Sequence, residues 1–178
     1  MTPTSKVCVV LPAYNVAATI GPLIQQIKAL RLDPIVVNDG STDRTVRTAT
    51  DAGAFVMSHL ANRGKGLALR TGFEFAMQNG YERIVTMDSD GQHDPAEIPR
   101  LLDAARDPQI AIVVGHRLID ASRMPWVRRA TNRVMSEIVS RTSVAPRVTR
   151  PEIGAMMVYV EARRWSAAIP SSSAATLL

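Results

Sequence analysis

The sequence has little of what a disulfide-bonded, membrane-spanning or nucleic-acid-binding protein needs. Its 178 residues include a single cysteine, Cys8, which excludes an intramolecular disulfide and a thiolate-rich metal site. Aromatic residues make up only 4% of the chain, which disfavours surfaces that stack bases. Apolar runs such as Val7–Leu11 are far shorter than the roughly 20 residues of a membrane-spanning helix, and the N-terminus carries no signal-peptide core. We therefore expect a cytoplasmic protein with no nucleic-acid partner, with attachment to the inner face of the membrane as an alternative.

Positive charge is present but uneven. The net charge is +5, and residues 116–178 contain 10 basic and 4 acidic side chains. A field of this sign attracts anionic headgroups or a phosphorylated substrate.

Short apolar runs alternate with segments of helical periodicity over the first two thirds of the chain. This alternation predicts an α/β fold with a doubly wound, mostly parallel sheet flanked by helices. We expect one domain over residues 1–170, with a regular core (6–115) and a less regular remainder (116–170), followed by a disordered tail (171–178). The predicted strands are 6–11, 34–37, 54–58, 83–87 and 110–115, and the predicted helices are 20–30, 43–51, 66–79 and 95–105.

The segment MDSDGQHDP follows the predicted strand 83–87 and carries the strongest chemical signal. Asp88 and Asp90 are one residue apart at a strand end, where their oxygens can reach one cation, and Gln92 adds a carbonyl oxygen. Oxygen ligands favour Mg²⁺ or Mn²⁺, which commonly bridge carboxylates to substrate phosphates. The alternative is a solvated turn or a helix cap, but the position after a buried strand favours a site.

Two further loops follow predicted strands. In VVNDGSTDRT, Asp39 is placed to accept hydrogen bonds from a nucleobase, unless Asn38, Asp39, Ser41 and Thr42 merely cap the next helix. In NRGKGLALRTG, Lys65 lies at a helix start, where N–H groups and the helix dipole favour an anion. This loop lacks the G-x-x-x-x-G-K-[ST] spacing of nucleoside triphosphatases.

Five segments occur in this order: LPAYN, VVNDGSTD, NRGKGLALRTG, MDSDGQHDP and VVGHR. Together they resemble inverting family-two glycosyltransferases of the GT-A type, especially those that glycosylate polyprenyl or dolichyl phosphate. The resemblance covers about residues 6–140. It implies metal ligation by Asp88, Asp90 and Gln92, and catalytic roles for Asp90 and for Arg117, which is directed at phosphate. It assigns the nucleotide sugar to Pro12, Ala13, Tyr14, Asn15, Asp39, Lys65, Asp88 and Ser89.

Two departures from the family pattern stand out. The first affects a contact to the base or ribose of the donor. The second affects the acceptor side, which the resemblance places at residues 116–170 and which is truncated or divergent here. Val16 stands where relatives usually carry a glutamate. The segment RVTRPEIGAMM, with Arg150, Gly154, Ala155 and Met156, lacks the acidic residue and the Gly-aromatic-Arg signature of the family. A hydroxyl acceptor would suffer from a missing carboxylate base, whereas a lipid phosphate is already anionic.

The sequence therefore predicts a metal-dependent inverting glycosyltransferase that uses Mg²⁺ or Mn²⁺ and moves a sugar from a nucleotide-sugar donor to a polyprenyl phosphate. An inactive or binding-only remnant that retains donor binding is a second hypothesis. A nucleotidyltransferase is a third, but PAYNVAAT supplies no Gly-rich loop for a triphosphate.

Overall fold

A mostly parallel sheet lies at the centre of the computed structural model, which describes residues 6–106, 112–115 and 157–161. In this part of the chain the sheet has six strands in the order β3-β2-β1-β4-β6-β5. β1 pairs in parallel with β2 and β4, β2 pairs in parallel with β3, and β4 pairs antiparallel with β6. The predicted α/β fold is confirmed. The strands are β1 (Val7–Ala13), β2 (Asp33–Asn38), β3 (Phe55–Ser58), β4 (Arg83–Thr86), β5 (Ile112–Gly115) and β6 (Met157–Glu161).

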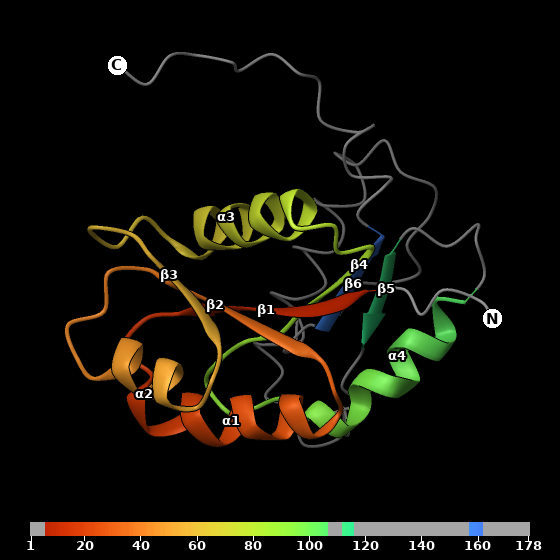
Figure 1. The fold of residues 1–178 in the computed structure, drawn as a ribbon, viewed down its shortest axis with the longest axis horizontal. Helices are drawn as coiled ribbons and strands as arrows, with labels where there is room; N and C mark the ends of the chain where they lie inside the picture. The colour runs from red at the N-terminus through yellow and green to blue at the C-terminus, as the bar shows by residue number, and fades with distance from the viewer. Residues whose placement is uncertain (1–5, 107–111, 116–156, 162–178) are drawn as a thin grey trace, which may run out of the picture. The chain divides into compact units, whose positions relative to one another are not determined.

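Helices cover both faces of the sheet, which explains why its central strands are apolar throughout. α1 (Ala17–Ala29), α2 (Thr45–Asp51) and α4 (Ile98–Ala104) lie on one face, together with the short 3₁₀ helix η1 (Pro95–Glu97). α3 (Lys65–Gln78) lies on the opposite face (Figure 1).

The side chains of β1 divide between two hydrophobic clusters because successive strand residues point to opposite faces. Val9 and Leu11 pack in the cluster that contains the apolar residues of α1, α2 and α4. Cys8 and Val10 pack in the cluster that contains Phe73 of α3. β1 therefore contributes side chains to both clusters. Each of its fully buried valines or leucines stabilises the fold by roughly 1.5–3 kcal/mol.

The strand boundaries differ from the prediction at Pro12. The sequence predicts that β1 ends before this residue, but the strand continues to Ala13. Proline has no N–H to donate, and it is tolerated here because β4 pairs with β1 only as far as Val10. On the other side β2 continues, with Val37 opposite Pro12.

β6 is a strand that the sequence does not predict. It comes from the region assigned to the acceptor side, and it pairs with β4 through the register Arg83↔Glu161 to Thr86↔Val158. The helix expected at 95–105 is divided into η1 and α4, and the Asp94 side chain accepts a hydrogen bond from the Ala96 N–H at its start. The sequence also places Val127, Ala130, Val134 and Ile138 at helical spacing, and this segment lies outside the described residues.

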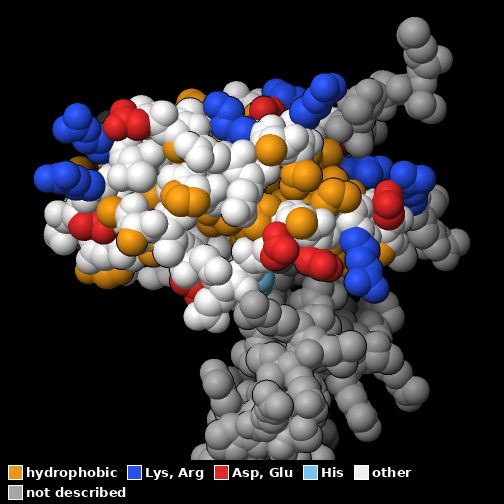
Figure 2. Space-filling view, turned by 90° about the horizontal axis from the view of Figure 1, so that it is seen from below, with side chains coloured by type: hydrophobic (Ala, Val, Ile, Leu, Met, Phe, Trp, Pro, Cys, Tyr) orange, Lys and Arg blue, Asp and Glu red, His pale blue; other side chains and the backbone are white. Residues whose placement is uncertain are grey.

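Surface charge on the face of α1, α2 and α4 is mixed. Figure 2 shows acidic and basic side chains scattered among apolar ones over this face, without separation by sign. The basic segment that the sequence places beyond residue 115 lies outside the described residues. None of the helices in the described ranges combines the length and the apolar content needed to cross a membrane.

Two glycines of α3 give a matched test of how closely this helix packs on the sheet. A Cβ at Gly72 would overlap Cγ1 of Val10 and lie 3.3 Å from Cγ2 of Val37, whereas a Cβ at Gly66 would meet no atom within 4 Å. We expect Gly72→Ala to lower the free energy of unfolding by about 1–3 kcal/mol through overpacking. Gly66→Ala should raise it by up to about 1 kcal/mol through helix propensity.

Urea unfolding followed by circular dichroism measures both changes. Equal stability of the two variants would contradict the close contact between α3 and β1.

Candidate functional site

A cleft opens where the loops that follow β1, β2 and β4 meet. These strands are parallel, so their carboxyl ends lie at the same edge of the sheet. The loop after β2 is tied to the end of β1, because the Asp39 N–H donates to the Ala13 carbonyl at 2.8 Å. The cleft has a volume of about 250 Å³. It is lined by Pro12, Ala13, Tyr14, Val16, Asp39, Asn62, Lys65, Ala68, Asp88, Ser89 and Asp90.

The acidic loop after β4 is held by its central serine. Ser89 is buried, its Oγ donates to the Pro12 carbonyl at 2.8 Å, and its own carbonyl accepts from Thr19 Oγ1 at 2.6 Å. Because Ser89 is anchored in this way, its neighbours Asp88 and Asp90 are left to line the cleft. Asp90 Oδ1 accepts a hydrogen bond from the Gln92 N–H, which tightens the turn after the two carboxylates.

Lys65 approaches the same carboxylates from the first residue of α3. Its Nζ lies 2.5 Å from Asp88 Oδ1. The lysine side chain is 58% exposed and that of Asp88 is 29% exposed, so this ion pair faces the solvent of the cleft.

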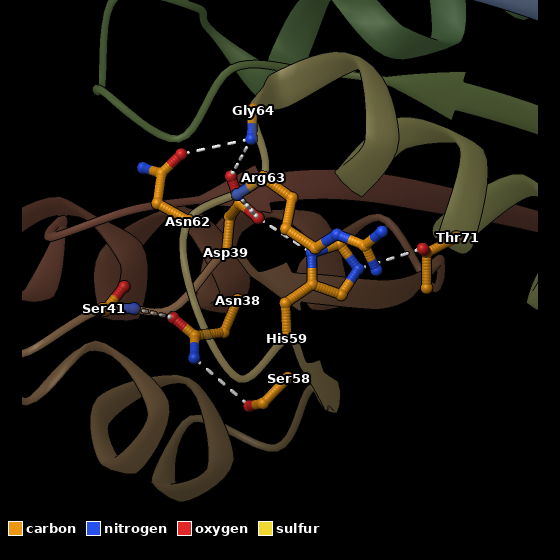
Figure 3. A network of polar contacts seen from close by, with 9 residues as sticks. All are labelled: Asn38, Asp39, Ser41, Ser58, His59, Asn62, Arg63, Gly64 and Thr71. Atoms are coloured by element: carbon orange, nitrogen blue, oxygen red, sulfur yellow. Dashed lines mark hydrogen bonds and ion pairs between the residues drawn. The ribbon is translucent and has the colours of Figure 1, made fainter.

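Asp39 is enclosed by hydrogen-bond donors from the loop before α3. Its Oδ1 accepts from His59 Nδ1 at 2.7 Å and from the Arg63 N–H at 2.9 Å, and its Oδ2 accepts from the Gly64 N–H at 2.7 Å (Figure 3). A carboxylate only accepts, so Nδ1 of His59 carries a hydrogen, and Nε2 on the other side of the ring is hydrogen-bonded to Thr71 Oγ1 at 3.0 Å. From a distant loop, Asp39 thus holds the two residues that precede Lys65, the first residue of α3.

The environment of Asp39 favours its charged form. Burial alone would raise the pKa of this carboxyl, but the hydrogen bonds from the Arg63 N–H, His59 and the Gly64 N–H outweigh it and hold the pKa below its usual value. Asp39 therefore stays ionised at neutral pH while its side chain is only 5% exposed.

Gly40 allows the loops after β2 and β3 to touch. Its φ is +74°, and a Cβ there would lie 2.5 Å from the carbonyl carbon of Ala61 and 2.6 Å from the Asn62 nitrogen. Only glycine fits this contact. Asp39 and Gly40 together therefore hold the loop that leads to Lys65.

The polar residues after Asp39 connect loops instead of capping α2. Ser41 Oγ accepts from the Asn15 N–H, and Asn15 Oδ1 accepts from the Thr42 N–H, both at 2.9 Å. The side chain that accepts from the first N–H of α2 is that of Asp43, which bonds the Thr45 N–H at 2.9 Å, so the alternative in which Asn38, Asp39, Ser41 and Thr42 cap this helix is wrong. These bonds instead fix the backbone next to Tyr14.

The structure brings together most of the residues that the sequence assigns to the site. Asn15 and Gln92 do not line the cleft: Asn15 is bonded to the loop after β2, and Gln92 donates a hydrogen bond from its backbone N–H to Asp90 Oδ1. Arg117 lies outside the described residues. The predicted residues that line the cleft are Pro12, Ala13, Tyr14, Asp39, Lys65, Asp88, Ser89 and Asp90.

Some residues of the site are not singled out by the sequence. Asn62 and Ala68 line the cleft, and both lie in the segment NRGKGLALRTG, which marks their loop but not their roles. His59 does not line the cleft, but it holds Asp39 through the hydrogen bond from Nδ1 to Oδ1. It precedes that segment, and no motif or periodicity in the sequence identifies it.

The oxygen donors of the cleft suit a hard divalent cation that shares its ligands with a substrate. Asp88 and Asp90 supply carboxylates, and among the described residues no group of three or more His, Cys, Asp or Glu side chains is arranged for a metal. A site made by these described residues alone would be incomplete. Mg²⁺ and Mn²⁺ sites are commonly completed by phosphate oxygens and water, so the donor set fits such an ion.

Comparisons with known proteins agree with this arrangement. The sequence profile of Glycosyl transferase family 2 matches residues 8–159. The chain is 33% identical over 128 residues to an undecaprenyl-phosphate mannosyltransferase of Micrococcus luteus, a match that covers 67% of this chain and 51% of that enzyme. It is 31% identical over 137 residues to a polyprenol monophosphomannose synthase of Mycolicibacterium smegmatis, with 71% and 51% covered. The chain thus spans about half the length of these relatives.

The fold matches that of a solved enzyme. The structure of glucosyl-3-phosphoglycerate synthase from Mycobacterium tuberculosis with Mn²⁺, UDP-glucose and phosphoglyceric acid has a TM-score of 0.65 to this chain and 25% sequence identity. The match covers 90% of this chain and 58% of the enzyme. The same enzyme has also been solved with Mg²⁺ and UDP.

The family profile extends from β1 to β6 and includes every loop that forms the cleft. This chain belongs to glycosyltransferase family 2 and has its GT-A fold.

Proposed function

We propose that this chain transfers a sugar from a nucleotide-sugar donor to a polyprenyl phosphate by a single, inverting displacement that depends on Mg²⁺ or Mn²⁺. One observation carries the proposal: Asp88, Asp90 and Lys65 line the same cleft as Tyr14 and Asp39. Groups suited to a cation and a diphosphate are thereby placed beside groups suited to a nucleoside. The known structures with Mn²⁺ and UDP-glucose, or with Mg²⁺ and UDP, support this choice of ligands.

The nucleoside half of the donor would lie against the loop after β1. Pro12 and Ala13 supply backbone and apolar surface, and Tyr14, which is 47% exposed, offers a ring face to the base. Asp39 Oδ2 accepts a hydrogen bond from the Gly64 N–H and retains capacity for another from the base. Asn15 would act indirectly by fixing the backbone beside Tyr14, and Ser89 by holding the acidic loop.

The diphosphate would lie between the acidic loop and α3. When bound, a divalent cation neutralises charge on the departing nucleoside diphosphate. Asp88 and Asp90 would hold it, with Gln92 as a further oxygen ligand. Lys65 would donate hydrogen bonds to phosphate oxygens, and Arg117 is assigned the same task on the acceptor side. Their positive charges stabilise the negative charge that develops on the leaving group.

An anionic acceptor suits the carboxylates of the cleft. Asp88 and Asp90 are assigned to the cation, and Asp39 already accepts three hydrogen bonds. Among the described residues that line the cleft no other carboxylate remains to act as a base. A phosphate oxygen attacks without losing a proton, whereas a hydroxyl group needs a base. Two relatives whose names specify polyprenyl acceptors support the same choice.

Removing either acidic side chain tests the metal assignment. We expect Asp88→Asn and Asp90→Asn each to weaken Mn²⁺-dependent binding of UDP at least about tenfold, because each changes a direct metal ligand. Mutation of residues that only support metal ligands already lowers metal affinity by about 10–100-fold. Isothermal titration calorimetry with and without Mn²⁺ measures the effect. Asp51→Asn is the matched control, because Asp51 is exposed on α2 and pairs with Arg47. Binding that survives in both cleft variants would refute the metal site.

The acceptor assignment is tested by comparing a polyprenyl phosphate with the corresponding polyprenol. We expect transfer of radiolabelled sugar from a nucleotide-sugar donor to the phosphate and none to the alcohol, because only the phosphate is ionised without a base. Thin-layer chromatography of the lipid product measures the transfer. Donor binding without transfer to any lipid phosphate would instead favour a binding-only protein.

Asp39 links stability to donor binding. Its pKa is lower in the folded chain than in the unfolded one, so its stabilising contribution is complete above the unfolded pKa of about 4 and is lost as the pH falls through the folded value. We expect Asp39→Asn to lower the free energy of unfolding at pH 7 by about 1–3 kcal/mol, because an NH₂ group replaces one carboxylate oxygen and an N–H donor that faces it loses its acceptor. The variant should also lose part of the acid sensitivity of the wild type.

Urea unfolding between pH 3 and pH 7 measures both effects, with Asp51→Asn again as the control. The same variant should bind UDP more weakly, because the loop that carries Lys65 loses its anchor. Unchanged stability together with weaker UDP binding would show that Asp39 contacts the base but does not support the loop.

A further inference from the structure

We propose that Lys65 acts as an internal cation that a metal can displace. Its ammonium pairs with the Asp88 carboxylate in the absence of ligands, and it moves to the diphosphate of the donor when a divalent metal binds Asp88. The inference rests on the proposed function, because it requires Asp88 to be a metal ligand. It adds that metal and donor assist each other's binding through one side chain.

The contact that suggests this role is the ion pair itself. Lys65 Nζ lies 2.5 Å from Asp88 Oδ1, at an oxygen that a cation in the cleft would use. Among the described residues that line the cleft, Lys65 is the one cation beside three carboxylates, Asp39, Asp88 and Asp90. Its ammonium therefore reduces the repulsion between the acidic groups of the empty site, and it must leave Asp88 Oδ1 before a metal binds there.

The backbone of Lys65 is fixed, whereas its side chain is free to move. The Gly64 N–H is bonded to Asp39 Oδ2 at 2.7 Å, and the Gly64 carbonyl accepts from the Ala68 N–H at 3.2 Å. A Cβ placed at Gly64 or Gly66 would meet no atom within 4 Å, so the flanking residues leave open space. The 58% exposed lysine can thus change its partner without any rearrangement of α3.

The strength of the pair is suited to exchange. Partly exposed ion pairs are weak because solvent screens them, so a divalent ion with two carboxylates available displaces the ammonium. Once released, the ammonium lies beside the position of the diphosphate and gains a new anionic partner. The metal therefore raises the affinity for the donor, and by linkage the donor raises the affinity for the metal by the same factor.

The inference predicts opposite effects of one substitution on two ligands. In Lys65→Gln, Asp88 has no competing cation, so Mn²⁺ alone should bind about two- to fivefold more tightly than to the wild type. UDP at saturating Mn²⁺ should bind about tenfold more weakly, because a charged hydrogen bond to phosphate is lost. The matched control is Arg70→Gln, which removes the same charge from α3 at a residue that pairs with Glu74 and should change neither affinity.

Electron paramagnetic resonance of free Mn²⁺ gives the first affinity and calorimetric titration with UDP gives the second. If Lys65→Gln binds Mn²⁺ no more tightly than Arg70→Gln does, the inference is wrong. Lys65→Ala serves as a second variant if Lys65→Gln does not fold by circular dichroism. Asp88→Asn distinguishes a failure of this inference from a failure of the proposed metal site. If Asp88→Asn leaves Mn²⁺ binding unchanged, the metal site is wrong. If it abolishes Mn²⁺ binding, a negative result with Lys65→Gln contradicts only the role of Lys65.

Discussion

The site depends on the parallel pairing of β1 with β2 and β4. This pairing brings the ends of three strands to one edge of the sheet, so that segments far apart in the sequence share a cleft. β1 is buried on both faces, which fixes its register, because a shift by one residue would exchange the side chains of its two clusters. The packing of Val9 and Val10 therefore keeps Tyr14, Asp39 and Asp88 close together.

A second level of order comes from the hydrogen bonds between the loops. Asp39 binds the N–H groups of Arg63 and Gly64, and the lack of a side chain at Gly40 lets the two loops touch. Ser89 fixes the acidic loop in a similar way, because its Oγ donates a hydrogen bond to the Pro12 carbonyl. Buried polar side chains therefore hold the backbone, and the groups that they leave in the cleft are the exposed lysine and the two aspartates. The chemistry that we propose needs this division between fixed supports and accessible ligands.

Much of this arrangement is predictable from the sequence, for reasons that are local. Val-rich runs ended by Asp or Pro identify the parallel strands, and the sequence also predicts that Asp88 and Asp90 follow one of them. β6 is not predictable in this way, because Met157–Glu161 lies in a part of the chain where the alternation of strand and helix patterns is weaker, and it pairs with β4 over a long sequence distance. His59 is missed because its role depends on a contact with Asp39 across two loops. Asn15 is assigned to the donor by resemblance, whereas its amide is bonded to Thr42.

The central claim is that Asp88 and Asp90 hold a cation that the nucleotide also binds. A crystal structure of the protein grown with Mn²⁺ and UDP tests it most directly. Our account predicts one Mn²⁺ with carboxylate oxygens of both aspartates and diphosphate oxygens at about 2.0–2.2 Å, the base beside Tyr14, and Lys65 turned from Asp88 toward phosphate. A nucleotide bound elsewhere, or a diphosphate held in this cleft without any metal at the two aspartates, would contradict it.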